Sequence, residues 1–331
     1  MAITVCGNCI NFGSQSICVD PAGIYVSGRF DFAGCDINPT HAQGSTSGYL
    51  SGGYGAPVGG PIQKFSFADP GSLGTYVGAL TEARRAGSGQ SSSVSGYHSG
   101  GRCDAGGYSA TIDKFPLSAE SGDATDVGEL TYSRCETVGA SSTTSGYAAG
   151  GRFPNSDTIN KFPFASDSNG TDSADLTAGT YRLAGHSSRT HGYASGGAGP
   201  QNTTIQKFSF SSDSNATDVG ELSTAKVYGA GQNSAENGYN SSGSSAPQAT
   251  RVTGIDKFPF ASDAPSTDIG DVTQGRCAAA GVSSTTDGYT AGGWGPPYRN
   301  TIDKFPFASD NNATSVAGMW GGSLGVQGHQ I

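Results

Sequence analysis

The chain has 331 residues, a formal net charge of −9 and a sequence pI near 4.9, with 53 glycines and only 14% charged residues. This acidic balance excludes the basic surface that binding to nucleic acid or to an anionic membrane requires. No segment reaches the roughly 20 apolar residues of a spanning helix, so we expect no membrane insertion. The first residues, MAITVCGNCINFG, lack the basic and long apolar regions of a secretion signal.

Two motifs recur six times along the chain, about 47 residues apart. Gly-Tyr-x-x-Gly-Gly has tyrosines at 49, 97, 147, 193, 239 and 289, with Ser242-Gly243 replacing the glycine pair in the fifth copy. Ile-x-Lys-Phe-x-Phe begins at residues 62, 112, 159, 205, 255 and 302, and Leu117 replaces its last aromatic residue once. The repetition predicts a repeat architecture.

Each repeat reads as four short strands separated by turn residues, and no segment shows a sustained helical period. In one unit the strands are 136–141 (A), 146–151 (B) and 158–164 (C), and strand D of the preceding unit is 126–130. We expect the glycine pair of strand B to allow close approach of backbones at a crowded central axis. The fold class is therefore all-β, a β-propeller of four-stranded blades.

The ends of the chain bear on the number of blades. Segments 3–5 and 16–21 resemble strands B and C, and Ile17 precedes Ile62 by about one period. Residues 322–328 then supply the missing strand A, so that both termini share and close the first blade. We predict one seven-bladed propeller over 1–331, with repeats starting near 1, 48, 96, 146, 192, 238 and 288. The alternative is six blades plus an N-terminal extension.

The order of motifs resembles the kelch-repeat propellers. The resemblance rests on Gly150-Gly151, on Ile159 to Phe162, and on Arg134 ahead of strand A. It implies the fold but not kelch-specific functions, because the kelch tryptophan after strand C is absent and Phe replaces the expected Tyr. The near-identical KFPFASD repeats, rich in Gly, Ser, Thr and Asn, also resemble fibre and virion-surface proteins of tailed phages.

Residues suited to catalysis form no repeated constellation. The five histidines do not recur with Tyr and Cys as a copper oxidase of this architecture requires, and recurring arginines before strand A fit a structural role better than a sialidase-like triad. Cys6 and Cys9 form a CxxC, but no second CxxC or His pair completes a zinc site. We expect no enzyme activity and no required cofactor.

The loops between strands C and D are rich in oxygen side chains. Two of them carry Asp, Asn and Asp at alternating or near-alternating positions, as a calcium loop requires, although the same residues form Asx-turns without an ion. The candidate calcium ligands are Asp167, Asn169, Asp172, Asp213, Asn215 and Asp218.

The loops between strands B and C vary in length, whereas the A–B loops are nearly uniform. Variable loops on a rigid scaffold are where specificity usually resides. The B–C loops and the D–A connections are expected on one face of the propeller. The predicted ligand-binding residues there are Arg102, Arg152, Phe153, Trp294, Tyr298 and Arg299.

These features favour a non-enzymatic virion structural or adhesion protein, such as a phage fibre, tail or capsid-attached propeller. Its expected partners are other virion proteins and a cell-surface glycan or receptor, and its expected location is the virion. The alternative is a soluble lectin or a cytoplasmic protein-interaction propeller.

Overall fold

The structure, a computed structural model, describes residues 43–330 apart from 56–59, 70, 72, 118–121, 200–202 and 246–249. It also describes the backbone of four N-terminal strands, β1 (Ile3–Cys6), β2 (Cys9–Phe12), β3 (Gln15–Asp20) and β4 (Gly23–Ser27). The chain forms two compact units, Met1–Asn38 and Pro39–Ile331. Every regular element of the described residues is a β-strand, which confirms the all-β prediction. The described residues contain no helix long and apolar enough to span a membrane.

The N-terminal unit contains a single antiparallel sheet in which each strand pairs with the next, in the order β1-β2-β3-β4. Two-residue connections join β1 to β2 and β2 to β3. Its register places Val5 opposite Ile10, and Ile10 opposite Ile17.

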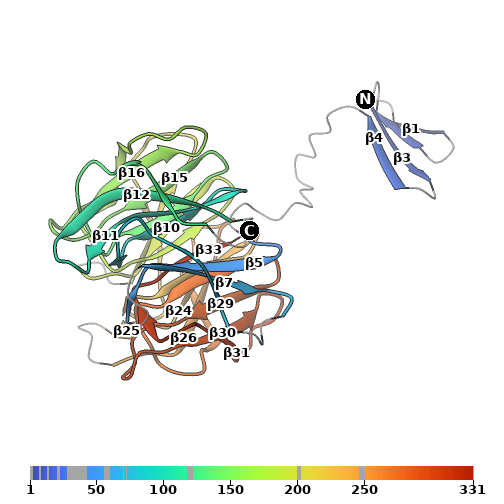
Figure 1. The fold of residues 1–331 in the computed structure, drawn as a ribbon. Helices are drawn as coiled ribbons and strands as arrows, with labels where there is room; N and C mark the ends of the chain where they lie inside the picture. Colours follow the sequence, from blue (N-terminus) through green and yellow to red (C-terminus); the bar gives the residue numbers. More distant parts are fainter. Residues whose placement is uncertain are drawn as a thin grey trace. The chain divides into compact units, whose positions relative to one another are not determined.

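The second unit is a propeller of six blades, each an antiparallel sheet of four main strands (Figure 1). From the axis outward, blade I is β33 (Gln327–Gln330), β5 (Ser47–Ser51), β7 (Pro61–Ser66) and β8 (Thr75–Ala79). Blade II is β10 (Ser88–Ser91), β11 (Ser95–Cys103), β12 (Tyr108–Pro116) and β13 (Thr125–Glu129), and blade III is β14 (Val138–Ser141), β15 (Ser145–Ala149), β16 (Thr158–Pro163) and β17 (Thr171–Asp175).

The remaining blades repeat this arrangement. Blade IV is β18 (Ala184–Ser187), β19 (His191–Ser195), β20 (Thr204–Ser209) and β21 (Thr217–Glu221). Blade V is β23 (Ala230–Asn233), β24 (Asn237–Ser241), β26 (Gly254–Pro259) and β27 (Thr267–Asp271), and blade VI is β28 (Ala280–Ser283), β29 (Asp287–Ala291), β30 (Thr301–Pro306) and β31 (Thr314–Gly318). Two-residue strands form further pairings: β6 (Tyr54–Gly55) pairs with β32 (Ser323–Leu324), β9 (Arg84–Arg85) with β11, and β22 (Lys226–Val227) with β25 (Ser244–Ser245).

The blade number is six, which corrects the prediction of seven and agrees with its stated alternative. The C-terminal strand β33 closes the ring by pairing with β5, with Gln327 opposite Ser51 and Gln330 opposite Gly48. The expected first blade, in which 322–328 would join 3–5 and 16–21, does not form, because those N-terminal residues pair within their own sheet. Alternating apolar and polar residues fit any antiparallel sheet, so their pattern could not distinguish a blade from a separate sheet.

The inner strands meet around the axis through a closed ring of glycines. The second residue of each inner strand is glycine, and a Cβ atom on it would overlap or crowd the carbonyl oxygen of the equivalent glycine in the preceding blade. For Gly89 that oxygen, on Gly328, would lie 2.7 Å from the added atom. This ring comprises Gly89, Gly139, Gly185, Gly231, Gly281 and Gly328. Glycine is required here because a side chain has no room.

The fourth residue of each inner strand forms a second closed ring, made of hydrogen bonds between blades. Its backbone N–H donates to the side-chain oxygen of the equivalent residue in the next blade, for example from Ser91 to Ser141 Oγ at 3.0 Å. The ring runs through Ser91, Ser141, Ser187, Asn233, Ser283 and Gln330 and returns to Ser91. It satisfies inner-strand amides that have no further strand to pair with.

The glycine pair after strand B has a different function from the one expected. Gly150 and Gly151 have φ angles of 63° and 117°, in the region that side chains disfavour, and they turn the chain out of β15. Ser242 holds the same conformation, with φ of 59°, in the blade that lacks the first glycine. The close approach at the axis involves the glycines of the inner strands instead.

The two sequence motifs meet at the seams between blades. The tyrosine of one blade stacks on the last phenylalanine of the next, as Tyr97 does on Phe164 with ring centroids 4.8 Å apart. The glycine before each tyrosine lies against the buried phenylalanine of its own blade, where a Cβ on Gly96 would overlap the ring of Phe115. Five seams share the stacked pair. The sixth brings Tyr49 and Leu117 into one buried cluster.

The chain enters the propeller at the end of the blades where the A–B turns lie. The Gln43 amide donates to the carbonyl oxygen of Ser284 at 3.1 Å, and the Gly44 N–H donates to that of Ser283 at 2.7 Å. These bonds attach the first described residues of this unit to the A–B turn of blade VI.

We predict that replacing an axial glycine destabilises the propeller far more than backbone conformation alone explains. Gly231→Ala forces a methyl group into the Gly185 carbonyl and should lower the free energy of unfolding by at least about 3 kcal/mol. Gly106→Ala is the control, because φ there is 100° but no atom lies within 4 Å of the added Cβ. The control should cost about 1 kcal/mol in denaturant titrations. Equal losses in both variants would contradict the steric explanation.

We also predict acid lability from buried histidines. Burial lowers the pKa of His186 and of His329 to about 4, so both are neutral in the fold. The unfolded chain binds their protons below a pKa of about 6.5, so stability present above pH 6.5 is lost as the pH falls toward 4.

The repeat itself supplies the control substitution for this prediction, because Gln90 and Gln232 occupy the equivalent position in other blades. His186→Gln and His329→Gln should each reduce the loss of unfolding free energy between pH 7 and pH 4.5, by up to about 3 kcal/mol. Identical pH profiles for the variants and the native chain, measured by chemical denaturation, would refute it.

Candidate functional site

A ring of six residues with left-handed backbone surrounds the axis just before the inner strands. Each residue donates its N–H to the carbonyl of the equivalent residue in the preceding blade, at 2.5–3.0 Å, and Gly325 closes the ring onto Ala86. Their φ angles lie between 54° and 68°. The ring consists of Ala86, Glu136, Arg182, Tyr228, Ala278 and Gly325.

Three consecutive ring residues carry large polar side chains that bind one another. Arg182 donates from Nε to Glu136 Oε2 at 3.0 Å and from Nη2 to Oε1 at 3.2 Å, and the Tyr228 hydroxyl also donates to Oε1. The Arg182 guanidinium lies 4.5 Å from the centroid of the Tyr228 ring and 5.1 Å from that of Tyr181. Burial and the adjacent carboxylate raise the pKa of Tyr228, so its hydroxyl remains a donor.

Above this ring lies a pocket of about 420 Å³, formed by the B–C loops and D–A connections of the blades. Glu136 is the one acidic residue among the described residues that line it. Five arginines line it as well, from blades II to V: Arg85, Arg102, Arg152, Arg182 and Arg251. The pocket is therefore cationic, although the whole chain carries a net charge of −9.

The five arginines differ in whether a carboxylate of the protein already neutralises them. Arg85 pairs with Asp104 at 2.8 Å, and Arg182 pairs with Glu136. Arg102 and Arg152 form no ion pair with any carboxylate of the described residues. Arg152 instead lies over the ring of Phe153, at 4.5 Å, and near that of Tyr181, at 5.0 Å. Two guanidinium groups of neighbouring blades thus remain available for an anion.

Aromatic side chains line the blade VI side of the pocket and its border with blade I. Trp294 and Tyr298 lie with ring centroids 4.9 Å apart, and Tyr298 contacts Tyr54 edge-on at 6.2 Å. Tyr298 is 36% exposed, so its ring remains accessible to a ligand. On the blade III side, Phe153 stacks on Tyr108 at 4.7 Å. Flat rings beside cationic groups suit a ligand with both an apolar face and a negative charge.

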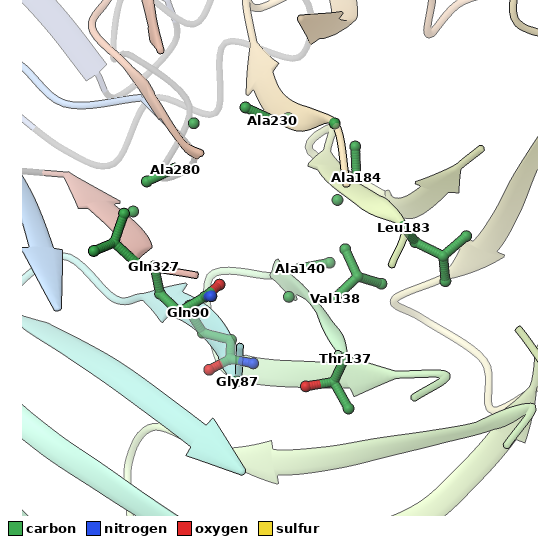
Figure 2. Close-up of a pocket in the computed structure, with 18 of the residues that line it drawn as sticks. Gly87, Gln90, Thr137, Val138, Ala140, Leu183, Ala184, Ala230, Ala280 and Gln327 are labelled. Carbon is green, nitrogen blue, oxygen red and sulfur yellow. The ribbon is translucent and has the colours of Figure 1, made fainter. Parts of the chain in front are cut away.

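A narrower cavity of about 130 Å³ continues along the axis from the pocket and shares part of its ring floor. Figure 2 shows how small side chains of the inner strands, among them Ala140, Ala184, Ala230 and Ala280, surround it. Gly87 and Thr137 belong to the same lining. The residues of the glycine and hydrogen-bond rings line this smaller cavity, and the larger volume open to a ligand is that of the pocket above it.

The structure brings five of the six predicted binding residues to the same pocket: Arg102, Arg152, Phe153, Trp294 and Tyr298. Arg299 does not line it, and its Nε is buried without a hydrogen-bond partner. Arg85, Glu136, Arg182, Tyr228 and Arg251 were not predicted. Aligning the repeats on the inner-strand glycine would have shown five different residue types at the ring position.

Two cysteines also line the pocket, Cys135 and Cys277. Burial raises the pKa of the Cys135 thiol to about 12 and also raises that of Cys277. Both remain protonated at neutral pH and contribute apolar surface rather than a nucleophile or metal ligand.

The candidate calcium residues have other partners in the structure. Asp167 accepts an ion pair from Lys114 of the preceding blade at 2.9 Å, and Asp213 accepts one from Lys161 at 2.9 Å. The side chains of Asn169 and Asn215 accept backbone N–H groups of Glu129 and Asp175. Asp218 accepts the N–H of Gly220, and Asp172 lies exposed in β17. The loops connect adjacent blades, and no group of three or more acidic, His or Cys side chains in the described residues is arranged to hold a metal ion.

Comparison with known proteins adds the fold alone. No family model matches the chain, and no curated protein matches it in sequence. The solved structure of YjhT is similar, with a TM-score of 0.62 and 14% sequence identity, over 75% of this chain and 88% of that one. This similarity supports the propeller architecture.

Four cations are fully buried under the pocket rim, two residues before the ring positions. Arg84, Lys226 and Arg276 pair with the aspartates Asp113, Asp256 and Asp303 at 2.6–2.8 Å. The recurring arginines noted in the sequence are thus structural in these blades, and Arg182 is not equivalent to them because it is a ring residue.

The fourth buried cation, Arg134, has no such carboxylate. Asn160 occupies the equivalent strand-C position, and its amide nitrogen has no hydrogen-bond partner. Arg134 instead donates to the Ala148 and Thr158 carbonyls, at 2.9 and 3.2 Å, and to the hydroxyl of Tyr132. Burial lowers the pKa of Arg134 accordingly.

We predict that Asn160→Asp stabilises the protein, because it supplies the carboxylate and removes the unpaired amide. The increase in unfolding free energy should be about 1–3 kcal/mol, seen as a higher melting temperature. Asp303→Asn, the reverse change in blade VI, leaves Arg276 without its carboxylate and should cost about 3 kcal/mol. Destabilisation by Asn160→Asp would refute the equivalence of the two positions.

Proposed function

We propose that this chain is a non-enzymatic binding protein that recognises an anionic glycan in the pocket above the propeller axis. The supporting observation is that five arginines and a single described carboxylate line one pocket in an otherwise acidic protein. Arginine binds planar anions such as carboxylates with two parallel hydrogen bonds. The cationic groups concentrate in this pocket although the chain as a whole carries a net charge of −9.

The aromatic residues of the pocket support a glycan rather than a small inorganic anion. Trp294 and Tyr298 present flat surfaces on which the apolar face of a sugar ring can pack. The volume of about 420 Å³ accommodates one or two sugar units. An acidic saccharide matches both the charge and the shape of the site.

The near-identical KFPFASD repeats, rich in Gly, Ser, Thr and Asn, resemble phage fibre proteins, and on this resemblance we place the binding protein on a virion. In that setting the propeller is an adhesin that binds a host-surface glycan, with other virion proteins as its partners. The first described residues of the propeller lie at the A–B end of the blades, opposite the end that carries the pocket. Absence of the chain from purified particles would refute this placement but not the binding. A soluble lectin or cytoplasmic interaction protein would then be the setting.

We predict that Arg102→Ala and Arg152→Ala each weaken binding of an acidic glycan about tenfold, and that affinity falls as salt concentration rises. A glycan array, followed by titration calorimetry of the best glycan at several salt concentrations, measures both effects. Arg189→Ala is the control, because it removes the same charge from the A–B turn of blade IV at the other end of the propeller. If Arg102→Ala and Arg152→Ala bind the acidic glycan as tightly as the Arg189→Ala control, the pocket is not an anion site. Binding of neutral glycans only would refute it as well.

A further inference from the structure

The six ring residues of the pocket floor share one backbone geometry but carry different side chains, and the fold does not require this difference. All six ring positions have the same left-handed backbone and the same hydrogen bond to the preceding blade. Ala86, Ala278 and Gly325 show that a methyl group or no side chain satisfies this geometry. Because larger side chains gain nothing in that conformation, Glu136, Arg182 and Tyr228 require another explanation.

The three side chains form a preorganised unit centred on the carboxylate. Both oxygens of Glu136 accept hydrogen bonds from Arg182, and Oε1 also accepts one from Tyr228. Glu136 and Arg182 side chains are each 12% exposed, so they reach the pocket while most of their surface is covered. The remaining lone pairs of the carboxylate can accept a hydrogen bond from a ligand.

We propose that Glu136 determines which anion the pocket accepts, selecting hydroxylated monoanions such as sugar carboxylates over dianions such as phosphate monoesters. This inference depends on the proposed function, because it concerns the ligand of the same site. The ligand's single negative charge binds Arg102 and Arg152, and its hydroxyl groups donate to Glu136. By neutralising Arg182, Glu136 limits the positive charge that a ligand meets at the floor, and so limits the negative charge of the ligand that the pocket can match.

The ion pairs of the pocket arginines support a preference for monoanions. Glu136 already neutralises Arg182, and Asp104 neutralises Arg85. Arg102 and Arg152 also line the pocket, and neither forms an ion pair within the described residues. Arg251 has an interaction of its own and does not enter this argument. A monoanion can bind this guanidinium pair while its uncharged remainder lies over the ring. A second negative charge on the ligand would meet an Arg182 that is already paired with Glu136.

The test uses two probes with the same sugar, glucuronate as the monoanion and glucose 6-phosphate as the dianion, at pH 8. Titration calorimetry should give at least about tenfold tighter binding of glucuronate to the native protein. Glu136→Gln should reduce that ratio to about one or reverse it. Glu136→Ala is a second variant whose backbone is tolerated, as Ala86 and Ala278 show, and it should have the same effect. Glu221→Gln removes a charge from an exposed outer-strand position and should leave the ratio unchanged.

Each result separates this inference from the proposal on which it rests. If glucose 6-phosphate binds the native protein as tightly as glucuronate, or if the ratio is the same in the Glu136 variants, Glu136 is not the selectivity residue while the anion site remains. If the native protein binds neither probe nor any acidic glycan of the array, the proposed function fails and this inference with it. Melting temperatures of the variants verify that they are folded.

Discussion

The close contact of six glycine backbones on the axis is the constraint from which the rest of the propeller follows. Because Gly89, Gly139, Gly185 and their equivalents leave no space for side chains, the inner strands approach until their amides can bond across the seams. The ring of hydrogen bonds through Ser91 and the left-handed ring through Ala86 are the two levels at which this happens. Six blades joined this tightly form a rigid floor, and the loops above it need only vary in sequence to change the pocket.

Away from the axis, each position of the strand-C motif contributes to a contact between blades. In the unit starting at Ile112, the isoleucine is buried, Asp113 binds Arg84 and Thr81, and Lys114 pairs with Asp167 of the next blade. The phenylalanine that follows, Phe115, belongs to the buried cluster that also contains Tyr49 of blade I. The motif is thus repeated because every seam needs the same set of contacts. Departures from the repeat, such as Asn160 in strand C and the side chains of the ring before strand A, mark positions where the fold alone does not determine the residue.

The sequence predicted the all-β class, the propeller and, for the four blade strands to which it gave bounds, the boundaries to within two residues, because turn glycines and alternating strands are local signals. It predicted five pocket residues, since loop length and residue type are also local. It could not give the blade number, because only the long-range pairing of β33 with β5 decides between six and seven. It missed Glu136, Arg182 and Tyr228 for a related reason. Residue 136 was expected inside strand A, but Glu136 has a left-handed backbone and precedes the strand. No local sequence signal indicated this turn.

The pairing of β33 with β5 also has a consequence for how the protein is made. Blade I lacks its inner strand until residues 327–330 have been synthesised, so blades II to VI emerge from the ribosome with the circle still open. During that time the edge of β5 and the facing side of blade VI are exposed to other nascent chains. We therefore expect the ring to close only after residues 327–330 have left the ribosome, and a deletion of these four residues to lower the solubility of the protein.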